Sequence, residues 1–474
     1  MSMLHVDPKT LTLMRLDLDQ REEAIRRYVY EALGSLPPAD LSDQIVAAFF
    51  VAARSMTVQA VGGEISYHMT SGVRSASPGS LLDQCSGKVV DCVHFEPNGR
   101  TGIVRVAFPL KMLLHEDGSL YTTDLLHIMA GEGTFGLTEH ADIKLVWVDM
   151  SDESLHRFPG PAHGAAGVRK LTGLANEEVA FGTILKPCTG ITPEEESALI
   201  SQAAANPLFI FVKEDENFLP GVAFAPLRER LRHAKQAIVR AKERRGGKGL
   251  IFAPHIGAPP QHFPALVDLA AEAGMNGIMF SEYYTGGAVR MARERLRRRP
   301  CPPAIYGHNG GISCRTRHVY REVLDYFARL DGVDFRQTAP LSCAGESLLR
   351  PTGLEWRKCE EALSRPAGGH PVVMMARAGG LDQGNIIQNL MDVSRHGSAG
   401  NYLFLAGSAI NGIKNKAGKY DPTLGALAME QALQVFRRRV YASPDQVTPQ
   451  ALASYACSNG LPELAEALRQ RYRL

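Results

Sequence analysis

A regular alternation of short apolar runs and longer amphipathic runs begins near Val179 and continues to about residue 410. The short runs have the length and the β-branched and aromatic content of strands, and the longer runs repeat apolar residues at helical spacing. The predicted strands are 179–187, 207–215, 249–257, 276–284, 303–311, 332–340, 371–380 and 401–410. Strands that alternate with helices form a parallel sheet, because each helix returns the chain across one face. Eight such units predict a (β/α)8 barrel of the α/β class, with an open doubly wound sheet as the alternative.

Two of the intervening helices carry independent signals. Thr192 stands at an N-cap position, Pro193 follows at the first helical position, and Glu195 completes the pattern of a capping box. The segment 225–244 repeats its apolar residues on one helical face. These residues are Leu227, Leu231, Ala234, Ile238 and Ala241.

The first 150 or so residues follow a different pattern. Residues 21–33 and 41–58 are predicted as helices, whereas three segments alternate apolar and polar residues as half-buried strands do. These segments are 89–97, 101–110 and 142–150. We therefore expect an N-terminal α+β domain over residues 1–160 and a barrel with C-terminal helices over 161–474. The segment 151–170, rich in glycine, proline and alanine, is predicted to link them.

Composition narrows the class of protein further. The 474 residues are 45% apolar and 22% charged, which is typical of a globular protein, and the formal net charge is only +2. This charge gives no electrostatic argument for a nucleic-acid or membrane partner, and the Arg-rich stretch 293–300 is interpreted as a solvated helix face. No run of about 18 apolar residues and no apolar leader occurs. The eight cysteines form no C-x-x-C pair, and free thiols fit a cytoplasmic location.

Charged and polar residues follow the predicted strands, at the end where barrel enzymes have their active sites. Lys213, Asp215 and Glu216 follow the second strand directly. A polar turn would explain them, but hard cations such as magnesium also require several oxygen ligands held close together. Lys186 ends the first strand and His308 the fifth. Further polar residues at strand ends are His255, Glu282, Asn309, Arg336 and Gln337.

The last two predicted strands end instead in small residues, which allow backbone N–H groups to approach a phosphate. These residues are Ala378, Gly379, Gly380, Ala406, Gly407 and Ser408. Together the strand ends would form a polar ring, with a carboxylate pair on one side and an anion-binding turn on the other.

The alternation of side chains along a strand adds a chemical detail. Phe209, Phe211, Lys213 and Asp215 should share one face, so the lysine and the first acid would stand together at the barrel mouth. Partial burial lowers the pKa of a lysine, and its neutral amine can then react with carbon dioxide to form a carbamate. A lysine carbamate with Asp215 and Glu216 would offer three oxygen donors to Mg²⁺.

The segments "GTILKP" (182–187) and "KEDEN" (213–217) resemble two motifs of the RuBisCO large-subunit superfamily. The resemblance implies a (β/α)8 barrel with a ferredoxin-like N-terminal domain. It also implies a carbamate on Lys213, magnesium bound by that carbamate with Asp215 and Glu216, and catalytic roles for Lys186 and His308. The positions expected to bind the substrate or its phosphate are Gly379, Gly380, Ala406, Gly407, Ser408, Asn309 and Glu132.

Several positions depart from the family pattern. Cys188 stands where the family has a second lysine, Asn309 where it has an arginine that holds a second phosphate, and Gln337 where it has a histidine. The segment 341–351 lacks the family's lysine, and Glu132 replaces an asparagine. These departures indicate a RuBisCO-like protein of the form IV type, not a carboxylase that fixes carbon dioxide.

The expected activity follows from the same resemblance. We expect an enolate or enediolate formed on a monophosphorylated, or even unphosphorylated, keto sugar or keto acid, with Mg²⁺ as the Lewis acid. The favoured chemistry is cleavage of a C–C bond, by decarboxylation or hydrolysis of a 3-oxo acid, or enolisation. An isomerase or tautomerase, and a ligand-binding barrel without catalysis, stay open. The resemblance also implies a homodimer, or a multiple of dimers, in which the N-terminal domain with Glu132 covers the partner's barrel.

Overall fold

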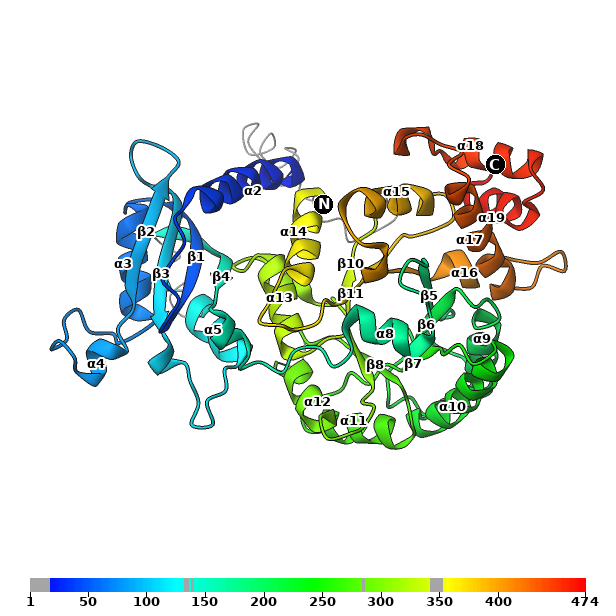
Figure 1. The fold of residues 1–474 in the computed structure, drawn as a ribbon, viewed down its shortest axis with the longest axis horizontal. Coiled ribbons are helices and arrows are strands. Elements are labelled where there is room, and N and C mark those ends of the chain that lie inside the picture. The colour runs from blue at the N-terminus through cyan, green and yellow to red at the C-terminus, as the bar shows by residue number, and fades with distance from the viewer. Residues whose placement is uncertain (1–17, 132–135, 138–139, 284–285, 342–352) are drawn as a thin grey trace, which may run out of the picture.

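The computed structural model describes residues 18–131, 136–137, 140–283, 286–341 and 353–474. Figure 1 shows two parts, an antiparallel sheet with its helices near the N-terminus and a ring of strands and helices formed by the rest of the chain. The expected fold, a TIM barrel preceded by a ferredoxin-like domain, is confirmed.

The N-terminal part has the strand order β2-β3-β1-β4, with antiparallel pairing throughout. Two helices connect its strands in the sequence βαββαβ, which is the ferredoxin-like arrangement. Its strands are β1 (Gln44–Ala53), β2 (Lys88–His94), β3 (Thr101–Pro109) and β4 (Ala141–Asp149). Its helices are α2 (Leu18–Ser35), α3 (Val58–His68), α4 (Leu81–Gln84), η1 (Leu110–Met112) and α5 (Thr122–Ala130).

The helix predicted over 41–58 was wrong, because most of this segment forms strand β1. β1 is a central strand: Phe49 is paired with Val104 on one side and Leu145 on the other. Residues 45–49 are buried in succession, so the polar alternation of a half-buried strand is absent. A continuous apolar run of this kind fits a buried helix and a buried strand equally well.

The barrel contains eight parallel strands in the order β7-β6-β5-β12-β11-β10-β9-β8. A parallel bridge between His255 and Met279 joins β7 to β8 and closes the ring. All eight predicted strands are confirmed, each shorter than its apolar run. They are β5 (Ala180–Ile184), β6 (Phe209–Lys213), β7 (Ile251–Ala253), β8 (Gly277–Phe280), β9 (Ala304–Gly307), β10 (Phe335–Thr338), β11 (Met374–Ala378) and β12 (Tyr402–Ala406).

The helices cover the outside of the ring, and the C-terminal helices extend it at one side (Figure 1). The capping box between Thr192 and Glu195 is present, and the predicted apolar face of the next helix is buried. The helices are α7 (Asp152–Leu155), α8 (Gly164–Thr172), α9 (Pro193–Ala203), α10 (Leu227–Arg244), α11 (Phe263–Glu272), α12 (Ala288–Leu296), η2 (Ile312–Cys314), α13 (Arg321–Asp331), α14 (Gly353–Ser364), α15 (Ile386–His396), η3 (Ala399–Asn401), α16 (Ser408–Asn411), α17 (Pro422–Arg437), η4 (Pro444–Gln446), α18 (Pro449–Ser458) and α19 (Pro462–Tyr472).

A β-bulge in β6 decides which side chains face the barrel interior. The pairing of β5 with β6 skips Ile210, which is the extra residue. Phe209 before it packs between the sheet and the outer helices, whereas Phe211 after it packs inside the barrel. The prediction that Phe209 and Phe211 share a face was therefore wrong, because a bulge shifts the alternation by one residue. Lys213 still follows Phe211 on the interior face, and its ammonium lies over the ring of interior Tyr306.

The interior of the barrel below the mouth is filled by aromatic rings. The ring of Phe211 lies 4.6 Å from that of Phe335 and 5.4 Å from that of Tyr306. Close-packed side chains of this kind make the barrel a solid core. The site expected in the barrel therefore lies at the mouth, above these rings.

The two parts share one hydrophobic core, which combines residues of the N-terminal sheet with residues of α13 and α14. Arg26 on α2 adds ion pairs to Glu322 on α13 at 3.3 Å and to Glu355 on α14 at 3.1 Å. The segment 151–170, expected as a link, contains α7 and most of α8 and is largely helical. The expected division at residue 160 stays a prediction.

Asp331 gives the contact between the two parts a dependence on pH. It lies at the end of α13 and accepts a 2.6 Å hydrogen bond from Thr122 of α5. Burial raises the pKa of Asp331 from 3.8 to about 7, although the Thr122 hydroxyl and Arg290 oppose this. The folded protein therefore holds this proton more tightly than the unfolded chain. Protonated Asp331 makes its full contribution to the free energy of unfolding below about pH 4. This contribution is lost as the pH rises through about 7.

Asp331→Asn removes this charge at every pH. We expect the variant to exceed the wild type in free energy of unfolding by about 2 to 4 kcal/mol at pH 8, and by less as the pH falls toward 4. Urea unfolding at both pH values measures the difference, with exposed Asp142→Asn as the control. An equal effect of Asp331→Asn at pH 8 and pH 4 would contradict the assigned ionisation.

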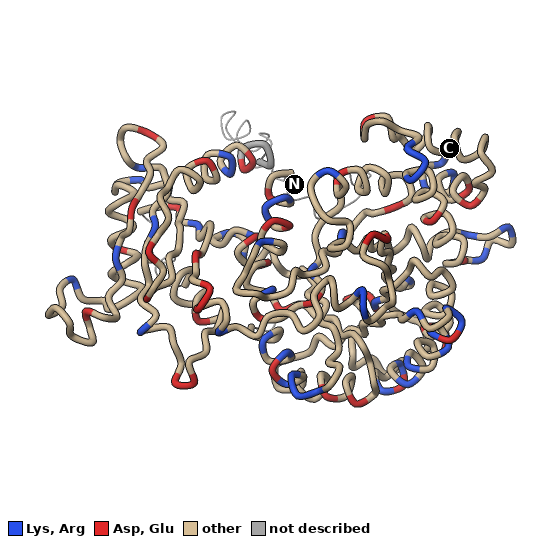
Figure 2. The backbone as a smooth tube through the Cα atoms, viewed as in Figure 1, with Lys and Arg blue, Asp and Glu red and all other residues tan. Residues whose placement is uncertain are grey.

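Figure 2 shows that basic and acidic residues are interspersed along the described chain without a single dominant region of either sign. Basic residues recur on the outer helices α10 and α12. In the stretch 293–300, Arg295, Arg297 and Arg298 are exposed as expected, whereas Arg293 is buried and pairs with Asp334. Among the described residues no helix combines the length and apolarity that a bilayer crossing requires.

Candidate active site at the barrel mouth

Lys213 is the centre of the charged group at the mouth. Its side chain is fully buried at the end of β6, where its Nζ donates to the Glu214 carbonyl at 3.0 Å and to Glu216 Oε2 at 3.3 Å. Burial lowers the pKa of Lys213, although the carboxylates of Glu216 and Asp215 oppose this shift. This shift makes the neutral amine, which is the form that reacts with carbon dioxide, easier to reach than it is for a lysine in water.

Lys186 and Asp215 form an ion pair across the ends of β5 and β6. A hydrogen bond from the Leu185 N–H to the Lys213 carbonyl, 2.9 Å long, fixes the two strand ends side by side. The ammonium of Lys186 also lies 2.9 Å from the sulfur of Cys188. Burial disfavours the charge, but the hydrogen bonds to Asp215 and Cys188 outweigh it and raise the pKa of Lys186.

His308, at the end of β9, completes the group. Its Nε2 lies 3.2 Å from Glu216 Oε2, and its Nδ1 accepts a 3.0 Å hydrogen bond from the Gly310 N–H. Because Nδ1 is an acceptor, the neutral ring carries its proton on Nε2 and donates it to Glu216. Burial lowers the pKa of His308, although the hydrogen bond to Glu216 opposes this shift.

These side chains fit a magnesium ion on one condition. Among the described residues, no group of three or more His, Cys, Asp or Glu side chains is arranged to hold a metal. Only two carboxylates, Asp215 and Glu216, meet at this point, and the ammonium groups of Lys186 and Lys213 now neutralise them. A carbamate on Lys213 would replace one of these cations with a third anionic oxygen ligand, so the donor set fits magnesium only after carbamylation.

A second charged group, which sequence reasoning missed, holds the segment after β6 from behind. Glu214 is fully buried, pairs with Arg230 of α10 at 2.6 Å and accepts a 2.8 Å hydrogen bond from the His255 N–H. Glu196 of α9 lies beside it, and burial together with the Glu214 charge raises the pKa of Glu196 well above its usual range. The signal in the sequence was Arg230, a charged residue within the apolar face of α10.

The turn after β12 lies directly against Lys186. A Cβ added at Gly407 would lie 3.4 Å from the Lys186 Cε, an ordinary van der Waals distance, so the turn and this side chain are close neighbours. Ser408 Oγ lies 3.4 Å from Arg471 of α19, and Arg471 also forms an ion pair with buried Asp382. The C-terminal helix therefore fastens the turns that follow β11 and β12.

The turn after β11 has the backbone that its sequence requires. Gly379 and Gly380 have φ values of 93° and 91°, a region that favours glycine. The roles of these glycines, and of Ala406, Gly407 and Ser408, in phosphate binding stay predictions.

The remaining predicted residues, Asn309, Gln337 and Arg336, do not all point into the barrel. Asn309 is buried, and its Oδ1 has no hydrogen-bond partner among the described residues. Gln337 points into the barrel and accepts a hydrogen bond from Tyr306. Arg336 instead faces outward, where it pairs with Asp325 at 2.7 Å and with Glu282.

Two expectations fall outside the described residues. Glu132 is one of them, and the segment 341–351 is described only at Leu341.

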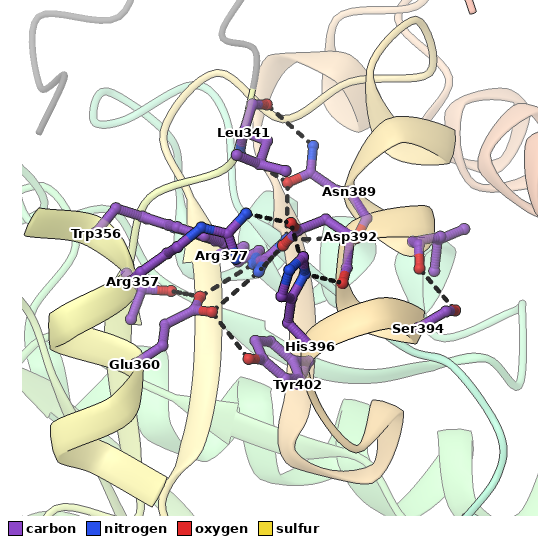
Figure 3. Close-up of polar contacts among 12 residues, drawn as sticks. Leu341, Trp356, Arg357, Glu360, Arg377, Asn389, Asp392, Ser394, His396 and Tyr402 are labelled. Carbon is purple, nitrogen blue, oxygen red and sulfur yellow. Dashed lines mark hydrogen bonds and ion pairs between the residues drawn. The ribbon is translucent and has the colours of Figure 1, made fainter. Parts of the chain in front are cut away.

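A buried ion network lies behind β11 and is shown in Figure 3. The guanidinium of Arg377 pairs with Glu360 of α14 at 2.9 Å and with Asp392 of α15 at 2.8 Å. Asn389 of α15 accepts a 2.8 Å hydrogen bond from the Leu341 N–H and returns one of 3.1 Å to its carbonyl. The network therefore joins α14 and α15 to Leu341, which follows β10. It lies outside the mouth.

Comparison with known proteins shows which proteins this chain is similar to. The catalytic domain of the ribulose bisphosphate carboxylase large chain matches residues 165–343. The 3-oxo-isoapionate-4-phosphate decarboxylase of Rhizobium etli is 28% identical over 237 residues, which cover 49% of this chain and 53% of the relative. The ribulose bisphosphate carboxylase of Archaeoglobus fulgidus is 27% identical over 300 residues, which cover 62% of this chain and 66% of the relative.

A solved rubisco-like protein from Burkholderia fungorum has the same fold. Its TM-score is 0.71 at 22% identity, and the match covers 90% of this chain and 99% of that protein. The two sequence matches span only about half to two thirds of the curated relatives.

The chain is therefore similar to the ribulose bisphosphate carboxylase large chain over residues 165–343 and, in sequence and fold, to RuBisCO-like proteins. The resemblance to RuBisCO-like proteins that the motifs suggested is confirmed.

Proposed function

We propose that this chain is a magnesium-dependent enzyme that cleaves a C–C bond of a 3-oxo sugar-acid phosphate by way of an enolate. The observation that carries the proposal is the convergence of Lys213, Asp215 and Glu216 with Lys186 and His308 at one barrel mouth. The name of the Rhizobium etli relative supports the substrate class, because that protein is a decarboxylase of a 3-oxo sugar-acid phosphate.

The residues have separate tasks in this proposal. Carbamylated Lys213, Asp215 and Glu216 would hold magnesium, which supplies Lewis-acid stabilisation of the enolate oxygen when bound. His308 orients Glu216 through its Nε2–H. Lys186 lies beside the turn after β12, so it would lie between the metal ligands and the phosphate.

The proton balance of decarboxylation gives Lys186 a further task. When the bond to the carboxylate breaks, carbon dioxide leaves and its bonding electrons form the enolate. The former α-carbon must then receive a proton, and the Lys186 Nζ can deliver one at the mouth. An isomerase would begin with the same enolate but would lose no carbon, so the product distinguishes the two reactions.

The test is incubation of the protein with a 3-oxo sugar-acid phosphate, magnesium and bicarbonate, followed by measurement of released carbon dioxide and of the phosphorylated product. We expect release by the wild type, at least a 100-fold loss in Lys186→Met, and no loss in exposed Lys416→Met. Conversion without loss of carbon would favour the isomerase, and recovery of unchanged substrate would contradict catalysis on this class.

We expect no carboxylation of ribulose bisphosphate. The neutral amide of Asn309 cannot supply the charge of the arginine found in the family, and residues 341–351 contain no lysine. Labelled bicarbonate and ribulose bisphosphate, incubated with the magnesium-loaded protein, measure the activity. Acid-stable label above the blank without enzyme would contradict the prediction, and the Archaeoglobus fulgidus carboxylase serves as the positive control.

We also propose a homodimer in which Glu132 of one chain approaches the barrel mouth of the other. This proposal comes from the family resemblance.

A further inference from the structure

Two buried carboxyl groups lie in contact behind the turn that follows β6. Glu196 of α9 is 1% exposed and Glu214 is fully enclosed, and their side chains are close enough for a hydrogen bond. Among the described residues, Arg230 is the only cation that pairs with either of them. Two carboxylates beside one guanidinium would leave a negative charge uncompensated in the core, which is strongly unfavourable. One of the two groups is therefore expected to hold a proton.

The hydrogen-bond donors around the pair indicate that Glu196 holds this proton. Glu214 Oε2 accepts from the Arg230 guanidinium at 2.6 Å and from the His255 N–H at 2.8 Å, and both donors favour an ionised Glu214. No donor among the described residues reaches Glu214 Oε1 or either oxygen of Glu196. A proton on Glu196 supplies the missing donor, since a neutral carboxyl group has one O–H. Burial and the Glu214 charge, which raise the pKa of Glu196, agree with this assignment.

Glu214 connects this pair to the candidate metal ligands. It stands between Lys213 and Asp215, and its backbone carbonyl accepts the 3.0 Å hydrogen bond from the Lys213 Nζ. The Arg230 guanidinium that holds its carboxylate also donates to the Leu219 carbonyl at 3.1 Å, farther along the same turn. A shift of the Glu214 side chain would therefore move the residues on both sides of it, Lys213 and Asp215.

We propose that Glu196 is a positioning residue whose carboxyl O–H donates to Glu214 Oε1 and thereby holds Lys213, Asp215 and Glu216 where they can bind magnesium. The inference rests on the proposed function and deepens it, because it adds a group on an outer helix to a site formed at the barrel mouth. The proton is essential to this role, since an ionised Glu196 would repel Glu214 instead of holding it.

Infrared spectroscopy detects the proton without metal or substrate. The difference spectrum between the wild type and Glu196→Gln cancels the bands of all other carboxyl groups. At neutral pH we expect it to show the carbonyl band of a protonated carboxyl group, shifted in D2O, that the variant lacks. Loss of a carboxylate band in its place would show that Glu196 is ionised and would overturn the proposal.

Calorimetric titration with Mg²⁺ in bicarbonate buffer tests the positioning role. Glu196→Gln should keep the wild-type affinity, because its amide N–H can donate in place of the O–H. Glu196→Leu should bind magnesium about 10- to 100-fold more weakly, as is usual when a group that orients a metal ligand is removed. Glu196→Asp, which withdraws the O–H by one carbon, should change the affinity in the same direction and replaces Glu196→Leu if that variant does not fold.

Ile200→Ala is the matched control for a purely structural effect. Ile200 is fully buried on the same helix, so its truncation lowers the stability of the protein but leaves Glu196 and Glu214 in place. Its magnesium affinity should equal that of the wild type.

The outcomes separate this inference from the proposed function. Equal magnesium affinity of Glu196→Leu and the wild type, or equal losses in Glu196→Leu and Ile200→Ala, would show that Glu196 only supports the fold and would overturn the positioning role. Absence of magnesium binding by the wild type would contradict the proposed function and the positioning role with it, whereas the infrared band would still decide where the proton lies.

Discussion

Asp215→Asn is expected to weaken magnesium binding by about 100-fold or more, because it removes one of three anionic ligands from a cation that requires oxygen donors. In the absence of the metal, Asp215 balances the ammonium of Lys186. The neutral amide of the variant can neither act as an anionic ligand of magnesium nor balance the charge of Lys186. Calorimetric titration with Mg²⁺ in bicarbonate buffer measures the affinity.

The control for this experiment is Asp445→Asn, which removes a carboxylate from an exposed turn far along the chain. Its magnesium affinity should equal that of the wild type. Equal affinity of Asp215→Asn and the wild type, with both proteins folded, would show that the metal does not use this carboxylate.

Arg377→Met is expected to destabilise the protein by about 3 to 5 kcal/mol, since removing one partner of a buried ion pair leaves uncompensated charge in the core. The guanidinium is 1% exposed and holds Glu360 and Asp392 together in the network of Figure 3. Tyr402 also donates to Glu360, but a hydroxyl cannot neutralise the carboxylate. Urea unfolding measures the loss of free energy.

Arg357→Met is the matched control, because Arg357 pairs with the same Asp392 at 3.0 Å but is 37% exposed. Its loss should cost about 0 to 1 kcal/mol, as is usual for an ion pair in contact with water. Similar effects of the two substitutions would contradict the buried character of the Arg377 network.

The barrel could be predicted because its signals are local. Each strand is a short apolar run and each helix repeats at its own period, so the existence and order of the elements follow from the sequence, although the strands are shorter than their runs. The position of the site followed from Lys213, Asp215 and Glu216 standing directly after a strand, since parallel strands of a barrel end at one face. The structure brings these three residues to one point with Lys186 and His308.

Other features depend on contacts between distant segments. Strand β1 has an apolar run that fits a helix equally well, and only its pairing with β3 and β4 decides the matter. The bulge at Ile210 leaves no mark in an apolar sequence, yet it reverses the direction of Phe209. The hydrogen bond from the Tyr306 hydroxyl to Gln337 likewise joins two strands that are separate in the sequence.

The central claim is that Lys213 carries a carbamate that completes a magnesium site. Carbon-13 NMR of the protein in labelled bicarbonate, with and without Mg²⁺, tests it most directly. We predict a protein-bound carbamate signal that magnesium stabilises in the wild type and that is absent in Lys213→Met. A wild-type spectrum without this signal, or a signal that persists unchanged in Lys213→Met, would contradict the account.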